Sequence, residues 1–289
     1  MSAPAALELA VGALRVAALR SGQAGGRRVL ALHGWLDNAA SFLPLAAHLP
    51  GVDLVMVDLP GHGHSDHLPD GAQYTFADAL PRVLDIADAL GWERLTLLGH
   101  SMGAGIASMV AAAAPGRIEA LVAIEALGGL SAPEDETASR LRDHLAAVRA
   151  LPTKRLRVFP DLAAPVRARM MANQLGEDAA RLLVERGVRE VPGGYHWRTD
   201  PRLTLPTAVR LTEEQINDLV AAIECPTQVI YASPAQPYFP EPLRSQRAAL
   251  LRQGRVDVLP GSHHLHMEQP AAVAACIRAF LDGLDTAAS

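Results

Sequence analysis

Two short stretches of the sequence contain the residue types that hydrolytic enzymes use. Residues 60–67 read PGHGHSDH and have the spacing of half a binuclear zinc site, with His62, His64, Asp66 and His67 as candidate ligands. Residues 97–105 read LLGHSMGAG and place Ser101 in a G-x-S-x-G pattern, the form of a nucleophilic serine on a tight turn. Both patterns indicate hydrolysis, the first by metal-bound water and the second by an activated hydroxyl.

The serine pattern has flanking sequence that suits its chemistry. LTLLGHS predicts a buried strand, and the small residues after Met102 predict a helix that ends at Pro115-Gly116. Glycines two residues on either side of Ser101 permit a sharp turn that raises the hydroxyl above the sheet. The Met102 amide is then directed at the position of a developing oxyanion. The alternative is a glycine-rich turn in which Ser101 only caps the helix.

A serine hydroxyl is a weak nucleophile unless a base takes its proton. The stretch LPGSHHLHMEQP, directly after the last predicted strand, offers His263, His264 and His266. A buried carboxylate must orient such a histidine. Glu125 ends another predicted strand in the apolar text IEALG, where an ionised carboxylate needs a partner. The alternative for Glu125 is an ion pair with an arginine.

Buried strands and amphipathic helices alternate along most of the chain. Apolar runs predict strands over 7–19, 27–34, 52–61, 95–101, 118–128, 225–233 and 256–261, and helical spacing predicts helices over 75–90, 102–114, 243–251 and 270–284. This alternation predicts an α/β fold with a mostly parallel, doubly wound sheet. Residues 129–224 contain helical patterns without buried-strand runs, so we expect a helical cap there, inserted into a core of residues 1–128 and 225–289.

Composition excludes several classes of protein. Of the 289 residues, 49% are hydrophobic and 20% are charged, so the chain has enough apolar residues to form a large core. The net charge of −5 and the scattered basic residues argue against a nucleic-acid or membrane partner. Two isolated cysteines, Cys225 and Cys276, suit a reducing compartment. The N-terminus has no signal-peptide pattern, so we expect a cytoplasmic protein.

Several of these features together resemble the α/β-hydrolase superfamily over nearly the whole chain. They are His33-Gly34 after the first buried strand, PGHGHSD after the second, GHSMG, and the histidine-rich ending. The resemblance implies an α/β-hydrolase fold with a helical lid between two strands. It also implies His263 as the base, with His264 as the alternative, and the Trp35 and Met102 amides as oxyanion donors.

The acid departs from the commonest pattern of that superfamily. The loop after the lid, YASPAQPYFP, contains no acid before Glu241, whereas some branches carry the acid one strand earlier, at the place of Glu125. The stretches GGYHWRTDPRL, LTEEQ and PYF look most like serine hydrolase-like proteins. Ser101 in place of an aspartate sets the chain apart from haloalkane dehalogenases and epoxide hydrolases.

The serine hypothesis therefore predicts a Ser101–His263–Glu125 triad that hydrolyses an ester, thioester or lactone of a small apolar acid. Cleavage of carbon–carbon bonds, acyl transfer and a non-catalytic binding protein stay open, because they use the same fold. A metal site would need further ligands, and His144 and His196 fall in the cap. We expect no cofactor and no metal. The sequence leaves the oligomeric state open, a homodimer included.

Candidates for an apolar substrate surface lie near the first loop and in the cap. They are Trp35, Phe159, Met170, Met171, Tyr195 and Trp197. Packing within the cap is the alternative role for the five cap residues.

Overall fold

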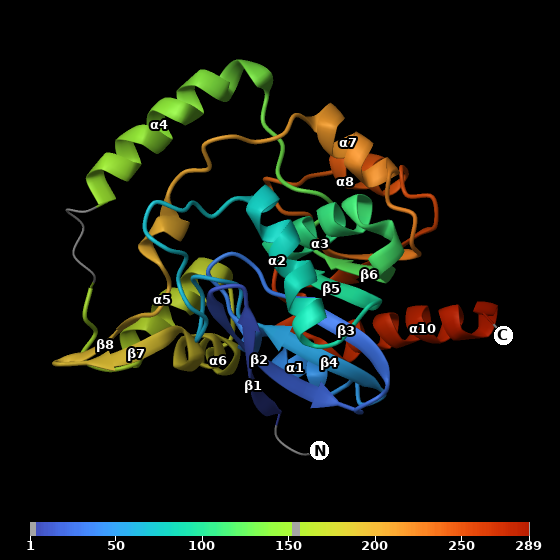
Figure 1. The fold of residues 1–289 in the computed structure, drawn as a ribbon, viewed down its shortest axis with the longest axis horizontal. Coiled ribbons are helices and arrows are strands. Elements are labelled where there is room, and N and C mark those ends of the chain that lie inside the picture. Colours follow the sequence, from blue (N-terminus) through green and yellow to red (C-terminus); the bar gives the residue numbers. More distant parts are fainter. Residues whose placement is uncertain (1–3, 152–156, 289) are drawn as a thin grey trace.

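A twisted eight-stranded sheet forms the centre of the molecule, as the computed structural model of residues 4–151 and 157–288 shows (Figure 1). Its spatial order is β1-β2-β4-β3-β5-β6-β9-β10. The strands are β1 (Ala5–Val11), β2 (Leu14–Gly22), β3 (Arg27–Leu32), β4 (Val52–Val57), β5 (Leu95–His100), β6 (Ile118–Ile124), β9 (Thr227–Ser233) and β10 (Gly254–Pro260). β1–β2 and β2–β4 pair antiparallel, and the other neighbours pair parallel.

Helices cover both faces of this sheet. The core helices are α1 (Leu43–Ala46), α2 (Phe76–Ala89), α3 (Met102–Ala113), α7 (Glu213–Ala221), α8 (Leu243–Ala248), α9 (Leu265–Glu268) and α10 (Pro270–Ala288), with short 3₁₀ turns η1 (Ala39–Phe42) and η2 (Pro115–Arg117). Leu30 and Leu32 pack with α2 and α3 on one face, while Val29 and Ala31 pack with α10 on the other. The central strands β3 to β6 are mostly apolar because their side chains alternate between two buried faces. The mostly parallel, doubly wound sheet is therefore confirmed.

The chain leaves the sheet after β6 and returns at β9, and the part of this insertion that precedes α7 is called the cap below. The cap contains η3 (Glu134–Glu136), α4 (Thr137–Ala150), α5 (Ala163–Asn173), α6 (Glu177–Gly187), β7 (Val188–Val191), β8 (Gly194–Trp197) and η5 (Pro201–Thr204). The hairpin β7–β8 differs from the sequence prediction, which expected only helices in this segment. Its turn residue Gly193 has φ +90°, a left-handed conformation that glycine adopts without strain.

Helix α7 lies within the segment 129–224 that the sequence assigns to the cap, yet it packs on the core. Ile216 and Val220 of α7 belong to the same buried cluster as β5 and α3. Thr212 caps α7 in a capping box with Gln215, which fixes the residue at which the helix begins. The separate part of the insertion thus ends before α7.

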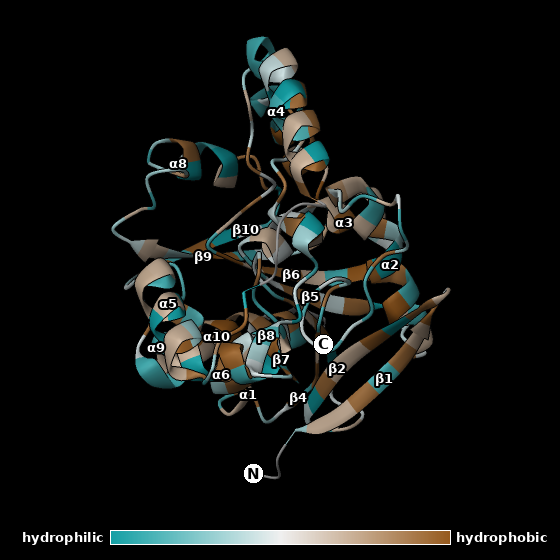
Figure 2. Cartoon of the chain, turned by 90° about the vertical axis from the view of Figure 1, so that its left-hand side faces the viewer, coloured by the Kyte–Doolittle hydropathy of each residue, from teal (hydrophilic) through white to brown (hydrophobic). Residues whose placement is uncertain are grey.

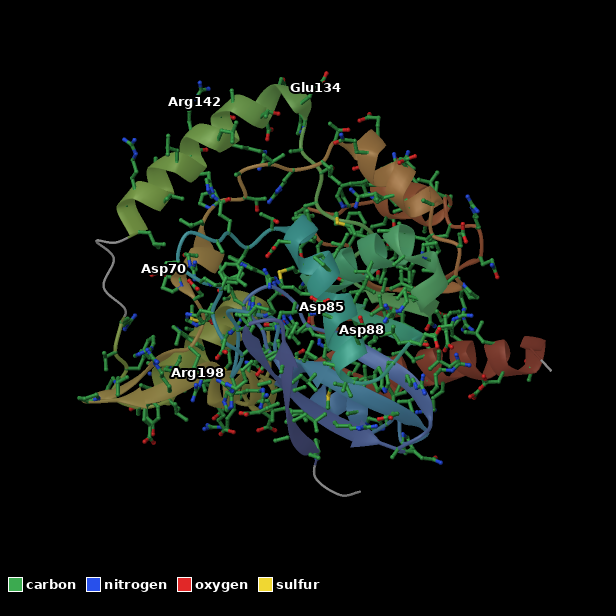
Figure 3. The ribbon with its side chains drawn as sticks, viewed as in Figure 1. Asp70, Asp85, Asp88, Glu134, Arg142 and Arg198 are labelled. Carbon is green, nitrogen blue, oxygen red and sulfur yellow. The ribbon has the colours of Figure 1, made fainter. Side chains whose placement is uncertain are left out.

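Helix α4 stands apart from the rest of the cap (Figure 1). None of its residues is buried, and Leu145 is 54% exposed. Arg142 of α4 and Glu134 of η3, the turn that precedes α4, extend outward (Figure 3). The hydropathy view contrasts its mixed surface with the apolar strands of the sheet (Figure 2). Within the described residues, none of the helices combines the length and apolar character that crossing a bilayer requires.

Candidate active site

Ser101 sits at the turn between β5 and α3 in a strained backbone conformation, with φ +51° and ψ −116°. The glycines of the motif are required by close packing. A Cβ at Gly103 would lie 1.9 Å from the Leu32 carbonyl oxygen, and one at Gly99 would lie 2.4 Å from the Cα of Ala104. The Ser101 amide donates to the Ile124 carbonyl at 2.9 Å, while its side chain caps nothing. Backbone sterics thus leave its hydroxyl free for another partner.

That partner is His263, whose Nε2 lies 2.9 Å from Ser101 Oγ. The opposite ring nitrogen, Nδ1, lies 3.1 Å from Glu125 Oε2. The structure therefore brings the three predicted triad residues into one continuous chain of hydrogen bonds. A carboxylate accepts only, so Nδ1 carries the proton and Nε2 presents its lone pair to the serine hydroxyl.

Glu125 is 4% exposed and occupies a tight position directly after β6, with φ +60°. Its Oε1 accepts the Ala232 amide at 2.5 Å, and its own amide donates to the Ile230 carbonyl at 2.9 Å. Both contacts come from β9, the neighbouring strand. A buried carboxylate is tolerated because one oxygen has this amide and the other has His263.

Residues Gly34–Asp37 form a tight turn beside the elbow. The Asp37 amide donates to the Gly34 carbonyl at 3.1 Å, and Leu36, the third residue, has φ +59°. This is the form of a type II turn, whose third position favours glycine. The Trp35 amide takes no part in the closing hydrogen bond. It lies in the loop that follows β3, as the oxyanion prediction requires, while the Met102 amide begins helix α3.

Two buried histidines support this turn. The Leu36 amide donates to His62 Nε2 at 3.3 Å, and His33 Nδ1 lies 2.7 Å from the Gly34 carbonyl oxygen. Burial lowers the pKa of His62 to about 3, so its ring is neutral and able to accept. The histidine of PGHGHSD that suggested a metal ligand therefore has a structural partner.

The four residues of the zinc hypothesis do not converge on one point. Beyond His62, the His64 amide donates to Asp58, the Asp66 carboxylate accepts from Arg15, and His67 contacts both Asp200 and the Arg198 carbonyl. The carbonyl of Arg198 belongs to the cap, and Figure 3 marks that residue. This segment is thus a hydrogen-bonded turn that joins the N-terminal strands to the cap.

A second polar cluster, which sequence reasoning did not find, lies behind the triad. Asp37, His100 and His264 are all at most 2% exposed, and one ligand atom of each lies within 4.8 Å of the others. Among the described residues these atoms form the arrangement that could hold a metal ion. However, Asp37 Oδ2 is 3.1 Å from His264 Nε2, and Asp37 Oδ1 is 3.3 Å from the Arg169 guanidinium. A cation placed there would meet the charge of Arg169, so the contacts favour a structural role.

His100 has a direct connection to the base. Its Nε2 lies 2.8 Å from the His263 carbonyl oxygen, which can only accept, so His100 carries its proton on Nε2. Burial lowers the pKa of His100 well below its ordinary value, and the ring is neutral. His264 faces Asp37, and His266 packs against Phe42 and His100. The alternative base, His264, thus contacts Asp37, whereas His263 contacts Ser101.

Tyr238 is another residue that the sequence did not single out. It lies in the acid-free loop after β9, and its hydroxyl is 3.1 Å from His263 Nδ1. Burial, with a smaller contribution from the charge of Glu125, raises the pKa of Tyr238 to about 12, so the phenol stays protonated. The PYF text was the available signal, because it stands in the loop that contains no acid before Glu241.

The predicted substrate-lining residues fall into two groups. Phe159, Met170, Tyr195 and Trp197 pack in or against the hydrophobic cluster of the cap, which corresponds to the alternative role. Met171 is 84% exposed, and its place on a substrate surface stays a prediction. Trp35 is 54% exposed, and its indole donates to the Leu203 carbonyl at 2.8 Å. Trp35 is the one of the six that lies outside the cap, in the turn Gly34–Asp37.

Comparison with known proteins adds independent information. Residues 27–197 match the family model described as alpha/beta hydrolase fold. A serine hydrolase-like protein of Dictyostelium discoideum is 30% identical over 270 residues, which cover 88% of this chain and 75% of that protein. Each finding is consistent with the sheet and the elbow.

Two solved structures are similar along nearly their whole length. A hypothetical protein from Pseudomonas aeruginosa PAO1 has a TM-score of 0.90 and 40% identity, with 96% of this chain and 99% of that chain covered. A thioesterase domain from the curacin biosynthetic pathway has a TM-score of 0.83 and 26% identity, with the same two coverages.

Proposed function

Because this chain belongs to the alpha/beta hydrolase family and is a hydrolase related to serine hydrolase-like proteins, we propose that it cleaves carboxylic esters or thioesters through an acyl-enzyme on Ser101. The substrate is a small molecule with an apolar acyl group. The lactone of such an acid belongs to the same class, since it presents the same carbonyl.

The observation that carries this proposal is the chain of contacts Ser101–His263–Glu125, with distances of 2.9 and 3.1 Å. Hydrogen-bond distances of this size connect a nucleophile, a base and an orienting carboxylate. The strained elbow supports the same role, because a structural serine needs no such strain.

In the proposed first step, His263 Nε2 takes the hydroxyl proton while Ser101 Oγ attacks the carbonyl carbon. The carbonyl π electrons move to its oxygen, which the Trp35 and Met102 amides stabilise. Glu125 stabilises the imidazolium that forms. The tetrahedral intermediate collapses when His263 returns the proton to the leaving alcohol or thiol, which leaves an ester of Ser101.

In the second step water replaces the alcohol. His263 removes a proton from water, whose oxygen attacks the acyl carbon, and the same oxyanion forms again. Collapse expels Ser101 Oγ, which recovers its proton from His263, and the acid is released.

The decisive experiment combines a fluorophosphonate probe with a panel of p-nitrophenyl esters of increasing acyl length. The wild type should be labelled on Ser101 and should hydrolyse short apolar esters. Ser101→Ala should lose labelling and about a million-fold in turnover. Labelling at another residue, or activity that survives this substitution, would refute the proposal.

The cellular location, the kinds of partner and the oligomeric state of the protein are also predictions. A cytoplasmic location is supported by two free cysteines, Cys225 and Cys276. The negative net charge supports a function without nucleic acid or an anionic membrane. The oligomeric state, including a homodimer, is open to direct measurement.

A further inference from the structure

The turn that carries the Trp35 amide is strained and depends on outside support. Leu36 occupies a left-handed conformation, with φ +59°, which is unfavourable for a residue with a branched side chain. Its amide is held by His62 of the core. Its carbonyl accepts a hydrogen bond from the guanidinium of Arg169, which belongs to helix α5 of the cap. The backbone of Leu36 is therefore hydrogen-bonded at its amide and at its carbonyl, and the partner of the carbonyl comes from the cap.

Arg169 also forms an ion pair with Asp37, the next residue of the same turn. Its NH1 lies 3.3 Å from Asp37 Oδ1, and both side chains are largely withdrawn from water, at 12% and 1% exposed. Burial alone would raise the pKa of Asp37, but the charge and hydrogen bond of His264 and the charge of Arg169 lower it overall. Asp37 is thus ionised and needs a cation beside it.

The Asp37 carboxylate extends this connection to the loop of the base. Its Oδ2 lies 3.1 Å from Nε2 of His264, the residue after His263. A single guanidinium from the cap therefore contacts the oxyanion turn directly and reaches the base loop through one carboxylate.

Arg169 is itself fixed within the cap. Its NH1 donates to Asn173 Oδ1 at 3.1 Å, and its guanidinium lies 5.9 Å from the ring centroid of Trp197. These contacts hold the planar donor in the orientation that serves both Leu36 and Asp37.

We propose that Arg169 is a positioning residue for the oxyanion hole: it holds the Gly34–Asp37 turn in the conformation that directs the Trp35 amide at the reacting carbonyl. The inference rests on the proposed function of the same site. It assigns to the cap a part in catalysis besides any selection of substrate, since docking of α5 completes the oxyanion hole.

The structure offers a matched control. Arg186 of α6 also forms a buried ion pair between the cap and the core, with its NH2 2.9 Å from Asp58 Oδ2 and its Nε 3.0 Å from Asp58 Oδ1. Its side chain is 14% exposed, against 12% for Arg169. Arg186→Gln therefore removes a comparable cap contact without touching the Leu36 carbonyl.

The test compares Arg169→Gln, Arg169→Lys and Arg186→Gln with the wild type on one good ester and on its thionoester, in which sulfur replaces the carbonyl oxygen. Arg169→Gln should lower kcat by about 10- to 100-fold, somewhat less than loss of a whole oxyanion donor, with KM within about threefold. It should also shrink the preference for oxoester over thionoester, because sulfur accepts poorly from the two amides. Arg169→Lys, which retains the charge, should restore part of kcat.

Arg186→Gln should lower the melting temperature at least as much as Arg169→Gln but keep the oxoester preference of the wild type. If the two glutamine variants lose activity alike and both keep that preference, Arg169 is only a cap anchor and the inference is wrong.

A backbone readout decides the inference separately from the proposed function. The crystal structure of Arg169→Gln should show Leu36 leaving the left-handed region, and an unchanged turn would overturn the proposal. Absence of Ser101-dependent hydrolysis in the wild type would instead overturn the proposed function, and the conformation of Leu36 would still test Arg169.

Discussion

Replacing Glu125 by glutamine tests the triad at its most unusual member. Glutamine has nearly the same shape, and the Ala232 amide, 2.5 Å from Glu125 Oε1, selects the carbonyl end of the new side chain. Its NH2 group is then directed at His263 Nδ1, which lies 3.1 Å from Oε2 in the wild type. A donor in that place favours the tautomer with the proton on Nε2, and this tautomer cannot accept a proton from Ser101.

The expected loss is large because the substitution removes both orientation and charge. A wrong tautomer in an otherwise intact triad costs about 10⁴ in kcat, which corresponds to about 5 kcal/mol of transition-state stabilisation. The fold should survive, since the amide keeps the hydrogen bond from Ala232. Combination with Ser101→Ala should add no further loss, because the members of a triad act as a unit.

The assay is the steady-state hydrolysis of a p-nitrophenyl ester, with thermal unfolding measured in parallel. Glu241→Gln is the matched control, since Glu241 is the first acid of the loop after β9 and its carboxylate is exposed and bound to Ser245. Its activity should stay within about twofold of the wild type, as is usual for a surface change. The reasoning fails if Glu125→Gln keeps a tenth or more of the wild-type kcat, or if Glu241→Gln is the variant that loses activity.

Three further predictions follow from the same contacts. Gly103→Ala should lower the free energy of unfolding in urea by about 3 kcal/mol or more, because the new Cβ would lie 1.9 Å from the Leu32 carbonyl oxygen. A Cβ at Gly116 would meet nothing within 4 Å, so Gly116→Ala should change that free energy by no more than about 0.5 kcal/mol. Equal effects of the two substitutions would contradict the packing argument. His62 stays neutral in the folded state, with its pKa lowered to about 3, so the unfolded state binds its proton first as pH falls below about 6.5. Between pH 7.5 and 5.5 this residue should remove about 1.4 kcal/mol of stability, and His62→Asn should show that much less pH dependence in urea unfolding; an unchanged slope would refute it. Prolonged dialysis against EDTA should leave esterase activity unchanged, whereas a loss restored by zinc would indicate a metal requirement.

Much of the fold was readable because it depends on neighbours in the chain. The apolar run Val52–Val57 becomes a strand buried on both faces, and the spacing from Phe76 to Ala89 becomes a helix capped by Thr75. Such patterns are local, since a strand repeats every two residues and a helix every 3.6. The hairpin β7–β8 was missed although Pro192-Gly193 between two β-prone stretches is a turn signal.

The supporting contacts of the site could not be read in this way. His264 and Asp37 are 227 residues apart in the sequence, and Arg169 and Leu36 are 133 residues apart. An arginine in a helical, arginine-rich stretch has no local feature that distinguishes it from a solvent-exposed one. Likewise, the sequence of α7 predicts a helix, but it does not predict that Ile216 packs in the core cluster that contains β5 and α3.

The sequence alone determined the strand–turn–helix at Ser101 and the short list of histidines and carboxylates that could serve it, because glycine spacing and hydrophobic period act over a few residues. Only the tertiary structure decided which histidine meets the serine, how Glu125 is satisfied and what holds the oxyanion turn. These contacts form when distant strand ends and the cap come together, and their geometry depends on packing across the whole sheet.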